Sequence, residues 1–577
     1  MIYRAVLRSA AVVVLLGAAT ACASTPATPV AAPAATVDAD LLDVTVAQLH
    51  RFYADRKYTV TQVVQWHLDR IDRYNGVYGA IETVFRDAAL AEARRQDAEP
   101  ATANHGPLWG VPVVIKANTS IKGQVTSAGW EGFTRPGHEL VAPEDATIVA
   151  RFKAAGAIIV GHTNMPDLAN SDTNRSSSFG RTGNAYDVRF SPGGSSGGTV
   201  TAVAANMAVL GNGTDTGNSI RMPAATSALV GVYPTRGLVS IAGIAPLDWL
   251  LDNTGPIARN AADAAIALAV MTGVDPLDPR TTDAPAAKQS GPYDSFLKAA
   301  ALKGKRFGVP AFILAGEGVP FHGIPAKVPE AAAEKFRVAA TMLLRPETLQ
   351  MFLKAVAALR AAGAEVVVDP SVLPAAFAKT ASRVSTYAYM QDGTNRFLAA
   401  FGPAEYHSAA DYLTSVGKPL FTSSIGSEES FSNIGGVRIE QRVLDADPDA
   451  ERNYHAPRRA TLAAYLATMD RLKLDGYVYP AIQMPPPDES MAQDGALSGG
   501  PHSNTSWVNM IGVPAVVVPA GFYESGLPFG VEFSARPWTD GDLLAIAYAW
   551  EQATKLRKPP TLVEKGLLPI TPARPAR

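Results

Sequence analysis

Apolar residues recur along most of the chain with the periods of helices and strands. The apolar positions between residues 60 and 74 have helical spacing behind Thr59 or Thr61 as N-cap, and Asn75-Gly76 is predicted to end this helix. Residues 111–115 form a largely β-branched run that ends at Lys116. A helix is predicted over 145–156 and a strand over 157–160. This strand, helix, strand order predicts a parallel arrangement.

The same alternation continues to the end of the chain. It predicts helix 261–272, strand 306–309, helix 347–362, strand 365–368, strands 476–479, 513–519 and 530–533, and helix 540–555. Residues 324–472 are mostly helical and interrupt the strand pattern, so we expect a helical cover over the core. The fold class is therefore α/β, with a large mixed β-sheet as its core.

Composition narrows the classes of function. The chain has 577 residues with 51 basic and 53 acidic side chains, a formal net charge of −2, so no basic surplus indicates nucleic-acid binding. With 47% hydrophobic and 18% charged residues it is expected to fold around a large core. Its one cysteine, Cys22, excludes an internal disulfide framework, a CxxC redox site and a thiolate zinc site.

The N-terminal segment has the features of an export signal. Arg4 and Arg8 precede a short apolar stretch over residues 10–19, and small residues follow up to Cys22. Residues 1–22 are predicted to be an export signal with a possible lipobox lipidated at Cys22. Simple secretion after cleavage and an uncleaved anchor are the alternatives. Residues 23–40 are predicted to be an Ala/Pro/Thr linker, residues 41–562 the folded domain and residues 563–577 a loose tail.

Two Gly/Ser clusters and one lysine are candidates for chemistry. Residues 193–198 read GGSSGG before an apolar helical stretch, and residues 211–221 form a second Gly-rich loop that contains Ser219. Successive backbone N–H groups at Thr216, Gly217 and Asn218 are candidates to point at one oxygen atom, as an oxyanion hole requires, and the loop taken alone is equally compatible with a phosphate cradle. Neither the GK[ST] ending of a P-loop nor a GxGxxG pattern occurs in this loop, which disfavours nucleotide binding.

Lys116 ends a strand that is otherwise apolar. A lysine is rarely buried unless it is paired or functional, and burial favours its neutral, basic form. The alternative is a surface lysine just beyond the strand end.

Together these elements resemble the amidase signature family. The matching stretches are SPGGSSGG at 191–198, GTD at 213–215 and SIR at 219–221, with Ser219 lying 24 residues after Ser195 and 103 residues after Lys116. The segments GPLWGVP at 106–112, GHTNMP at 161–166, GVPA at 512–515 and GLPFG at 526–530 are also similar to the family. The overall layout is most similar to peptide amidases and to fatty-acid-amide-hydrolase-like serine amidases.

The resemblance implies a fold, a mechanism and a set of site residues. It implies an amidase-signature-like sheet with helices on both faces, and a triad of Ser219 as nucleophile, Ser195 after a cis peptide bond as relay, and Lys116 as base. Asp215 and Arg221 are expected to hold the loop rather than to react. No cofactor and no metal are expected, and the expected substrate is a small-molecule or peptide amide, with the oligomeric state left open.

Two positions depart from the family pattern. Many members have Asp after the lysine, where this chain has Ala117, so the base is expected to be tuned differently. Gly commonly precedes the nucleophile, where this chain has Asn218. Because backbone N–H groups form the oxyanion hole, a side chain is tolerated there if its φ is allowed.

Three alternatives remain open. GSSGG at 194–198 satisfies GxSxG with Ser196 as nucleophile of an α/β-type serine hydrolase, with His455 and His502 as candidate partners. The second alternative is a non-catalytic, ligand-binding lipoprotein with the same fold. The third is the catalytic component of a tRNA-dependent amidotransferase. An export signal and the lack of a basic patch argue against the last of these. The expected location is extracytoplasmic, with the membrane contacted only through a lipid at Cys22.

Overall fold

The computed structural model describes residues 37–100, 105–285, 291–420, 434, 436–489 and 500–561. The predicted export signal, Cys22 and the predicted tail at 563–577 lie outside these residues. Within the described ranges, no helix is both long and apolar enough to cross a membrane.

Strands of the described residues build one large mixed sheet in the order β1-β3-β2-β6-β8-β7-β12-β13-β11-β9-β10. Pairing is parallel for β2 with β3 and β6 and for β9 with β10 and β11, and antiparallel elsewhere in this sheet; β4 and β5 form a separate hairpin. The strands are β1 Ile81–Val84, β2 Pro112–Lys116, β3 Ile158–Thr163, β4 Arg175–Ser176, β5 Gly180–Arg181, β6 Leu210–Asp215, β7 Val230–Tyr233, β8 Asn253–Ala258, β9 Arg306–Gly308, β10 Glu365–Val367, β11 Gly476–Pro480, β12 Ala515–Phe522 and β13 Pro528–Ser534.

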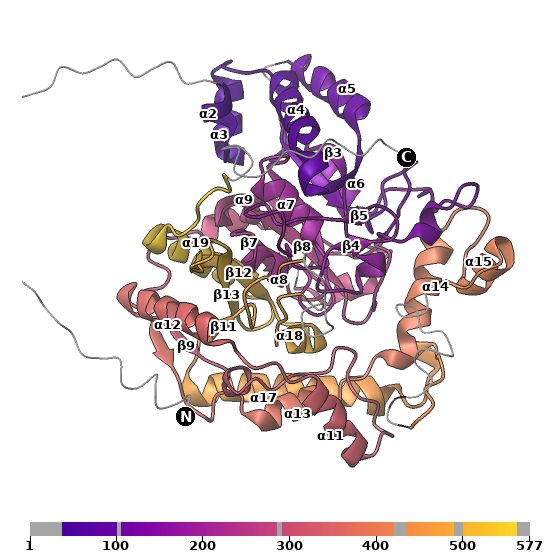
Figure 1. The fold of residues 1–577 in the computed structure, drawn as a ribbon, viewed down its shortest axis with the longest axis vertical. Coiled ribbons are helices and arrows are strands. Elements are labelled where there is room, and N and C mark those ends of the chain that lie inside the picture. Colours follow the sequence, from indigo (N-terminus) through magenta and orange to yellow (C-terminus); the bar gives the residue numbers. More distant parts are fainter. Residues whose placement is uncertain are drawn as a thin grey trace, which may run out of the picture.

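Helices surround this sheet (Figure 1). They are α2 Val37–Leu41, α3 Val46–Ala54, α4 Val60–Tyr78, α5 Arg86–Asp97, α6 Thr147–Ala154, α7 Gly197–Ala204, α8 Arg221–Ala225, α9 Ala261–Met271, α10 Ala311–Leu314, α11 Glu330–Ala339, α12 Pro346–Ala361, α13 Ala375–Ala381, α14 Met390–Phe401, α15 Ala409–Val416, α17 Ala456–Leu472, α18 Ser506–Ile511 and α19 Asp540–Thr554. Every residue of β2, β6, β8, β11 and β13 is buried, so both faces of the sheet are covered. The predicted α/β fold is confirmed.

The order of the sheet brings the candidate residues to one edge. β2 ends at Lys116 and β6 ends at Asp215, and these two parallel strands are direct neighbours. Parallel neighbours end at the same edge of a sheet, which is where ligands bind in α/β folds. Lys116 and the Ser219 loop after β6 therefore meet, although 103 residues separate Lys116 from Ser219.

The predicted end of the first long helix is wrong by one turn. Thr59 is its N-cap, with a capping box to Gln62, but the helix continues through Asn75-Gly76 to Tyr78. The Asn75 side chain instead binds the backbone at the start of the following strand, where its Oδ1 accepts the N–H groups of residues 80 and 81 at 2.9 Å. Gly79 ends the helix at φ 60°, where a Cβ would lie 2.6 Å from a backbone oxygen of Arg181.

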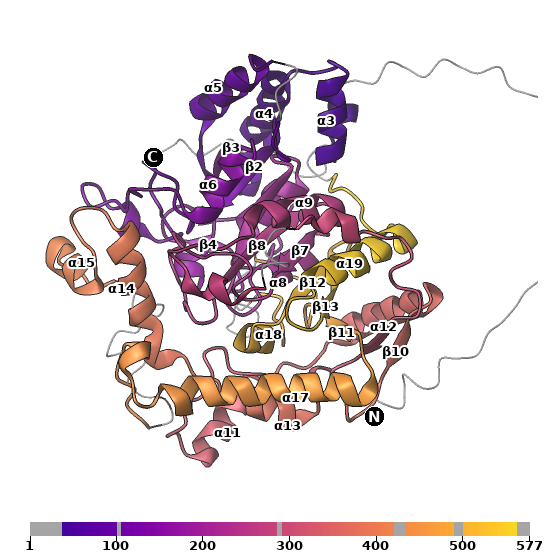
Figure 2. The same ribbon diagram turned by 180° about the vertical axis from the view of Figure 1, so that it is seen from behind.

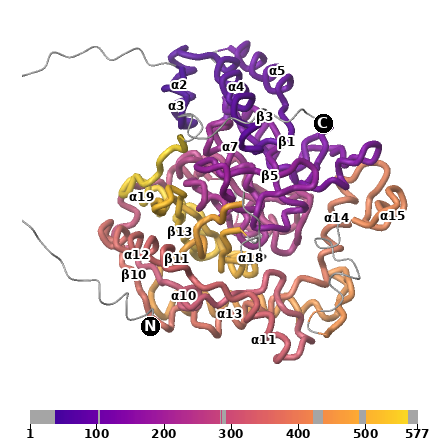
Figure 3. Tube along the Cα trace, viewed as in Figure 1, coloured from indigo at the N-terminus to yellow at the C-terminus, as the bar shows by residue number. Residues whose placement is uncertain are grey.

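The predicted linker ends earlier than residue 40. Val37–Leu41 is helix α2, and the Asp40 carboxylate pairs with Lys57 at 2.7 Å and accepts the Tyr58 hydroxyl at 2.5 Å. The beginning and the end of the described chain also meet, because Arg557 pairs with Asp43 at 2.6 Å. Figure 3 shows the segment after α19 running toward α2 and α3.

Residues 324–472 contribute the helices α11 to α15 and α17. α13 and α17 pack against each other and against α18, and they lie along one side of the molecule with α11, while α14 and α15 stand at one end of that row (Figures 1 and 2). The region also contributes β10, which pairs with β9 at the edge of the sheet. It is thus mostly helical, as predicted, and joined to the core.

Candidate active site

Lys116 is fully buried at the end of β2 and is surrounded by hydroxyl groups. Its Nζ donates to Ser195 Oγ at 2.7 Å, to Thr214 Oγ1 at 2.8 Å and to Ser196 Oγ at 3.0 Å. Burial lowers the pKa of Lys116, and the carboxylates of Asp215 and Asp252 partly oppose this effect, so the resulting pKa is about 7. The lysine is therefore close to half neutral at neutral pH, and a neutral amine accepts a proton from a hydroxyl.

Ser195 follows a cis peptide bond. The bond between Gly194 and Ser195 is cis, as the resemblance implied. Ser195 and Ser196 are both fully buried directly before α7. The Ser196 N–H donates to the carbonyl oxygen of Ser219 at 3.2 Å, so the peptide that follows the relay candidate rests against the nucleophile candidate.

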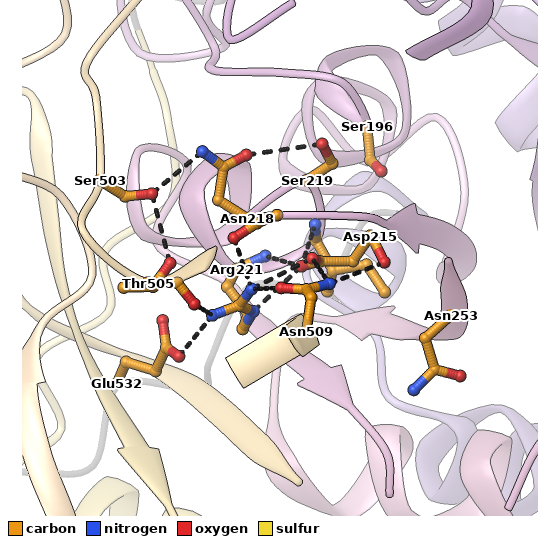
Figure 4. Close-up of polar contacts among 12 residues, drawn as sticks. Ser196, Asp215, Asn218, Ser219, Arg221, Asn253, Ser503, Thr505, Asn509 and Glu532 are labelled. Atoms are coloured by element: carbon orange, nitrogen blue, oxygen red, sulfur yellow. Dashed lines mark hydrogen bonds and ion pairs between the residues drawn. The ribbon is translucent and has the colours of Figure 1, made fainter. Parts of the chain in front are cut away.

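Ser219 lies in the turn between β6 and α8, and a buried ionic network fixes this turn (Figure 4). Arg221 donates to both carboxylate oxygens of Asp215 at 3.1 Å and to Glu532 Oε1 at 2.7 Å. It also donates to the carbonyl of Gly217 at 2.8 Å and to Asn509 Oδ1 at 2.5 Å.

These contacts indicate that Asp215 and Arg221 hold the loop. Both side chains are fully buried, and neither lines the cavity at Ser219. A supporting rather than a reacting role for both residues stays a prediction, with which their burial is consistent.

The loop at 216–219 presents backbone donors beside a cavity. Gly217, Asn218 and Ser219 line a cavity of about 250 Å³. In the part of the chain that the structure describes, their N–H groups form no hydrogen bond. Thr216 is buried behind them, and its Oγ1 donates to Asp252 Oδ1 at 2.6 Å. The arrangement offers N–H groups to a developing oxyanion.

Both departures from the family pattern have a structural account. Ala117 belongs to an apolar cluster with Met165, Ala169 and Leu247, where a carboxylate would be desolvated. Asn218 has no positive φ, so its side chain is accommodated without the left-handed conformation.

Several supporting residues escaped the sequence analysis. Thr214 Oγ1 accepts from Lys116 and from Asn118 Nδ2 at 3.1 Å, and so fixes the lysine. Asp172 lines the cavity and accepts from Asn218 Nδ2 at 3.1 Å. Asp172 lies in a loop and carries no distinguishing sequence pattern. Thr214 lies in β6, and its position inside the Gly-rich segment was the available indication.

The Ser196 alternative lacks the local structure it requires. A nucleophile elbow follows a buried strand, and residues 182–196, all of them described, contain none. Ser196 Oγ donates to the carbonyl of Thr214 at 3.2 Å and does not line the cavity. His502 lies near Asp172, with Nδ1 3.8 Å from Oδ2, and no hydrogen bond joins it to Ser196 among the described residues.

The amidase family model matches residues 62–322 and 327–544. This chain belongs to the amidase signature family. It is 31% identical over 537 residues to a glutamyl-tRNA(Gln) amidotransferase subunit from Symbiobacterium thermophilum, covering 91% of this chain and 99% of that protein. The native peptide amidase of Stenotrophomonas maltophilia is similar in structure with a TM-score of 0.70, at 29% identity over 90% of this chain and 98% of that one.

A structure of the peptide amidase PAM bound to the competitive inhibitor chymostatin is also similar, with a TM-score of 0.70 and 30% identity over 90% of this chain and 99% of that one. The fold and the family thus agree, and the chain is an amidase that acts on amide C–N bonds.

Proposed function

We propose that this amidase is an exported serine amidase that cleaves a carboxamide through an acyl-enzyme on Ser219. The observation that carries the proposal is the buried pair of Lys116 Nζ and Ser195 Oγ at 2.7 Å, next to a cavity that Ser219 lines. A buried amine with a pKa of about 7 and a hydroxyl in direct contact constitute a base and a proton relay.

The reaction has two halves that use the same relay. Ser219 Oγ attacks the carbonyl carbon while its proton passes to Ser195 Oγ, and the proton of Ser195 passes to neutral Lys116. The N–H groups at Thr216, Gly217 and Asn218 stabilise the oxyanion. The C–N bond then breaks as Lys116 returns a proton through Ser195 to the leaving nitrogen. Water hydrolyses the resulting ester by the same relay and releases a carboxylic acid.

The test is covalent labelling together with turnover. Wild type is expected to hydrolyse aryl amides and to react with a fluorophosphonate probe at Ser219, whereas Ser219→Ala loses both. Ser196→Ala is the matched control, since Ser196 contacts the same lysine but does not line the cavity; it is expected to keep the label on Ser219. Labelling at Ser196 would contradict the assignment.

Location is the second part of the proposal. The basic start, the short apolar stretch and the small residues before Cys22 support export with a lipid on this cysteine. Cys22→Ser is expected to release the protein from the membrane fraction while keeping its activity. A mature chain that begins after residue 22, or that carries no lipid, would contradict lipidation and leave secretion.

A second candidate function has support from the relatives. Curated relatives at 29–32% identity are named as a subunit of glutamyl-tRNA(Gln) amidotransferase. The balanced charge of −2 and the N-terminal segment favour a free-standing amidase instead. Amide hydrolysis by the purified chain alone supports the first candidate. Tight tRNA binding, with hydrolysis only after other subunits are added, would support the second.

A further inference from the structure

The cavity at Ser219 has one charged wall and one apolar wall. Among the described residues that line it, Asp172 is the only ionisable one, while Leu247, Val319 and Phe321 are apolar. Its volume of about 250 Å³ is below the roughly 300–1,000 Å³ of common ligand pockets. A substrate part the size of one amino acid residue suits this space better than a long acyl chain.

The segment that carries Asp172 is held tightly beside the triad. A Cβ on Gly194 would lie 2.5 Å from the backbone oxygens of Ser171 and Thr173, so the glycine before the relay serine lets this segment approach. Ser171 Oγ lies 2.9 Å from Thr173 Oγ1 and accepts the Thr173 N–H at 3.1 Å. These contacts fix the position of the carboxylate relative to Ser195.

Neutral groups surround the Asp172 carboxylate. Its Oδ1 accepts from Asn218 Nδ2, which also donates to Ser503 Oγ at 3.0 Å, and its Oδ2 lies 3.8 Å from His502 Nδ1. Burial lowers the pKa of His502, so this ring is neutral at neutral pH. No Lys or Arg of the described residues pairs with Asp172, whose side chain is 28% exposed.

The same carboxylate is ionised under assay conditions. Burial raises the pKa of Asp172 to about 6, with a further increase from the Asp215 carboxylate and a decrease from the Asn218 hydrogen bond. At pH 7.5 the group therefore carries its charge. A cation that enters the cavity would pair with it.

The spacing between Asp172 and Ser219 defines which position of the substrate would carry a positive charge. Asn218 Oδ1 is 3.5 Å from Ser219 Oγ, and the Nδ2 of the same carboxamide binds Asp172. One side-chain amide thus separates the two groups (Figure 4 shows Asn218 between Ser503 and Ser219). A charged group at Asp172 would lie within a few bonds of the carbonyl carbon that Ser219 attacks.

We infer that Asp172 binds a substrate ammonium group, and that the preferred substrates are amides with a free amino group next to the scissile carbonyl, the amino-acid amides. This inference rests on the proposed function of Ser219. The apolar wall of Leu247, Val319 and Phe321 receives the amino-acid side chain. The substrate class is thus an apolar amino-acid amide with an unblocked amine.

The experiment compares two amides that differ by one amino group. At pH 7.5, kcat/KM of wild type is expected to be about 10- to 100-fold higher for L-leucinamide than for 4-methylpentanamide, because a hydrogen bond to a charged group is lost in the second. N-acetyl-leucinamide is expected to resemble 4-methylpentanamide. Asp172→Asn is expected to reduce the ratio to about threefold or less. Asp167→Asn, a carboxylate in the same segment that does not line the cavity, is expected to keep the wild-type ratio.

The possible outcomes separate the inference from the proposed function. Hydrolysis of both amides by wild type at equal kcat/KM overturns the ammonium site and leaves the amidase assignment in place, whatever Asp172→Asn does. Absence of both hydrolysis and fluorophosphonate labelling overturns the proposed function. In that case calorimetry of Ser219→Ala with L-leucinamide still decides: binding that Asp172→Asn removes supports the ammonium site, and no binding overturns it.

Discussion

The buried lysine makes the free energy of unfolding depend on pH in a defined direction. Burial lowers the pKa of Lys116 to about 7 in the folded protein, whereas an unfolded lysine titrates near its ordinary value of about 10.4. Between these values the unfolded chain binds a proton that the folded protein does not. The free energy of unfolding therefore rises with pH across this window, and Lys116→Met removes this contribution.

The magnitude follows from the width of the window. Each pH unit well inside it contributes about 1.4 kcal/mol, so between about pH 7.5 and 9.5 wild type is expected to gain about 2 to 3 kcal/mol relative to Lys116→Met. Other titrating groups are present in both proteins and cancel in this difference. Urea unfolding of both at the two pH values measures it.

A surface lysine provides the control. The Lys122 side chain is 60% exposed and pairs with Glu144, so Lys122→Met is expected to follow the pH dependence of wild type. If Lys116→Met follows wild type as well, then Lys116 is charged in the folded protein at neutral pH. The assignment of Lys116 as the base would then fail together with the stability argument.

Three further predictions concern the triad, its supporting network and metals. Ser195→Ala is expected to lower kcat by a factor on the order of 10² or more, but by less than Ser219→Ala does. The double variant Ser195→Ala with Lys116→Ala is expected to lower kcat far less than the product of the two single losses in steady-state assays. Full additivity of the two losses would contradict a shared relay. Arg221→Met leaves the buried carboxylates of Asp215 and Glu532 without their cation. It is therefore expected to lower the free energy of unfolding by about 3–5 kcal/mol in urea titrations. An unchanged urea midpoint would contradict the role of the network. Chelation with EDTA is expected to leave amide hydrolysis unchanged, since the proposed steps use only serine and lysine side chains and backbone N–H groups; a loss reversed by metal would refute this.

The residues of the proposed triad lie in local sequence patterns that the edge of the sheet brings together. The apolar run before Lys116 marks a buried strand, and the Gly/Ser cluster at 193–198 marks a turn before a helix. The second cluster is a loop only after Asp215, because its first residues form the buried strand β6. The strand and helix periods also located most elements of the sheet to within a few residues. The end of α4 was missed because Gly79 and the cap by Asn75 depend on the approach of residue 181, a tertiary contact with no local pattern.

The parts that sequence analysis missed are defined by contacts between distant segments. Asp172, Asn218 and Ser503 come from three loops, and only the fold shows that Asn218 Nδ2 binds both of its neighbours. Likewise, the carboxylates that raise the pKa of Lys116 are Asp215 and Asp252, not a residue next to the lysine in sequence. Although Ala117 supplies no carboxylate next to the lysine, carboxylates from other segments therefore still act on the pKa of Lys116.

Asn218 links catalysis to the choice of substrate. A glycine at this position would offer the oxyanion only its N–H, whereas the asparagine also holds Asp172 and places its Oδ1 3.5 Å from Ser219 Oγ. The Asn218 side chain thus contacts both the proposed nucleophile and a carboxylate of another loop. Since the Arg221 network fixes the same loop through the Gly217 carbonyl, contacts in the buried core set the position of that carboxylate. Substrate selection by charge and oxyanion stabilisation then depend on the same rigid turn.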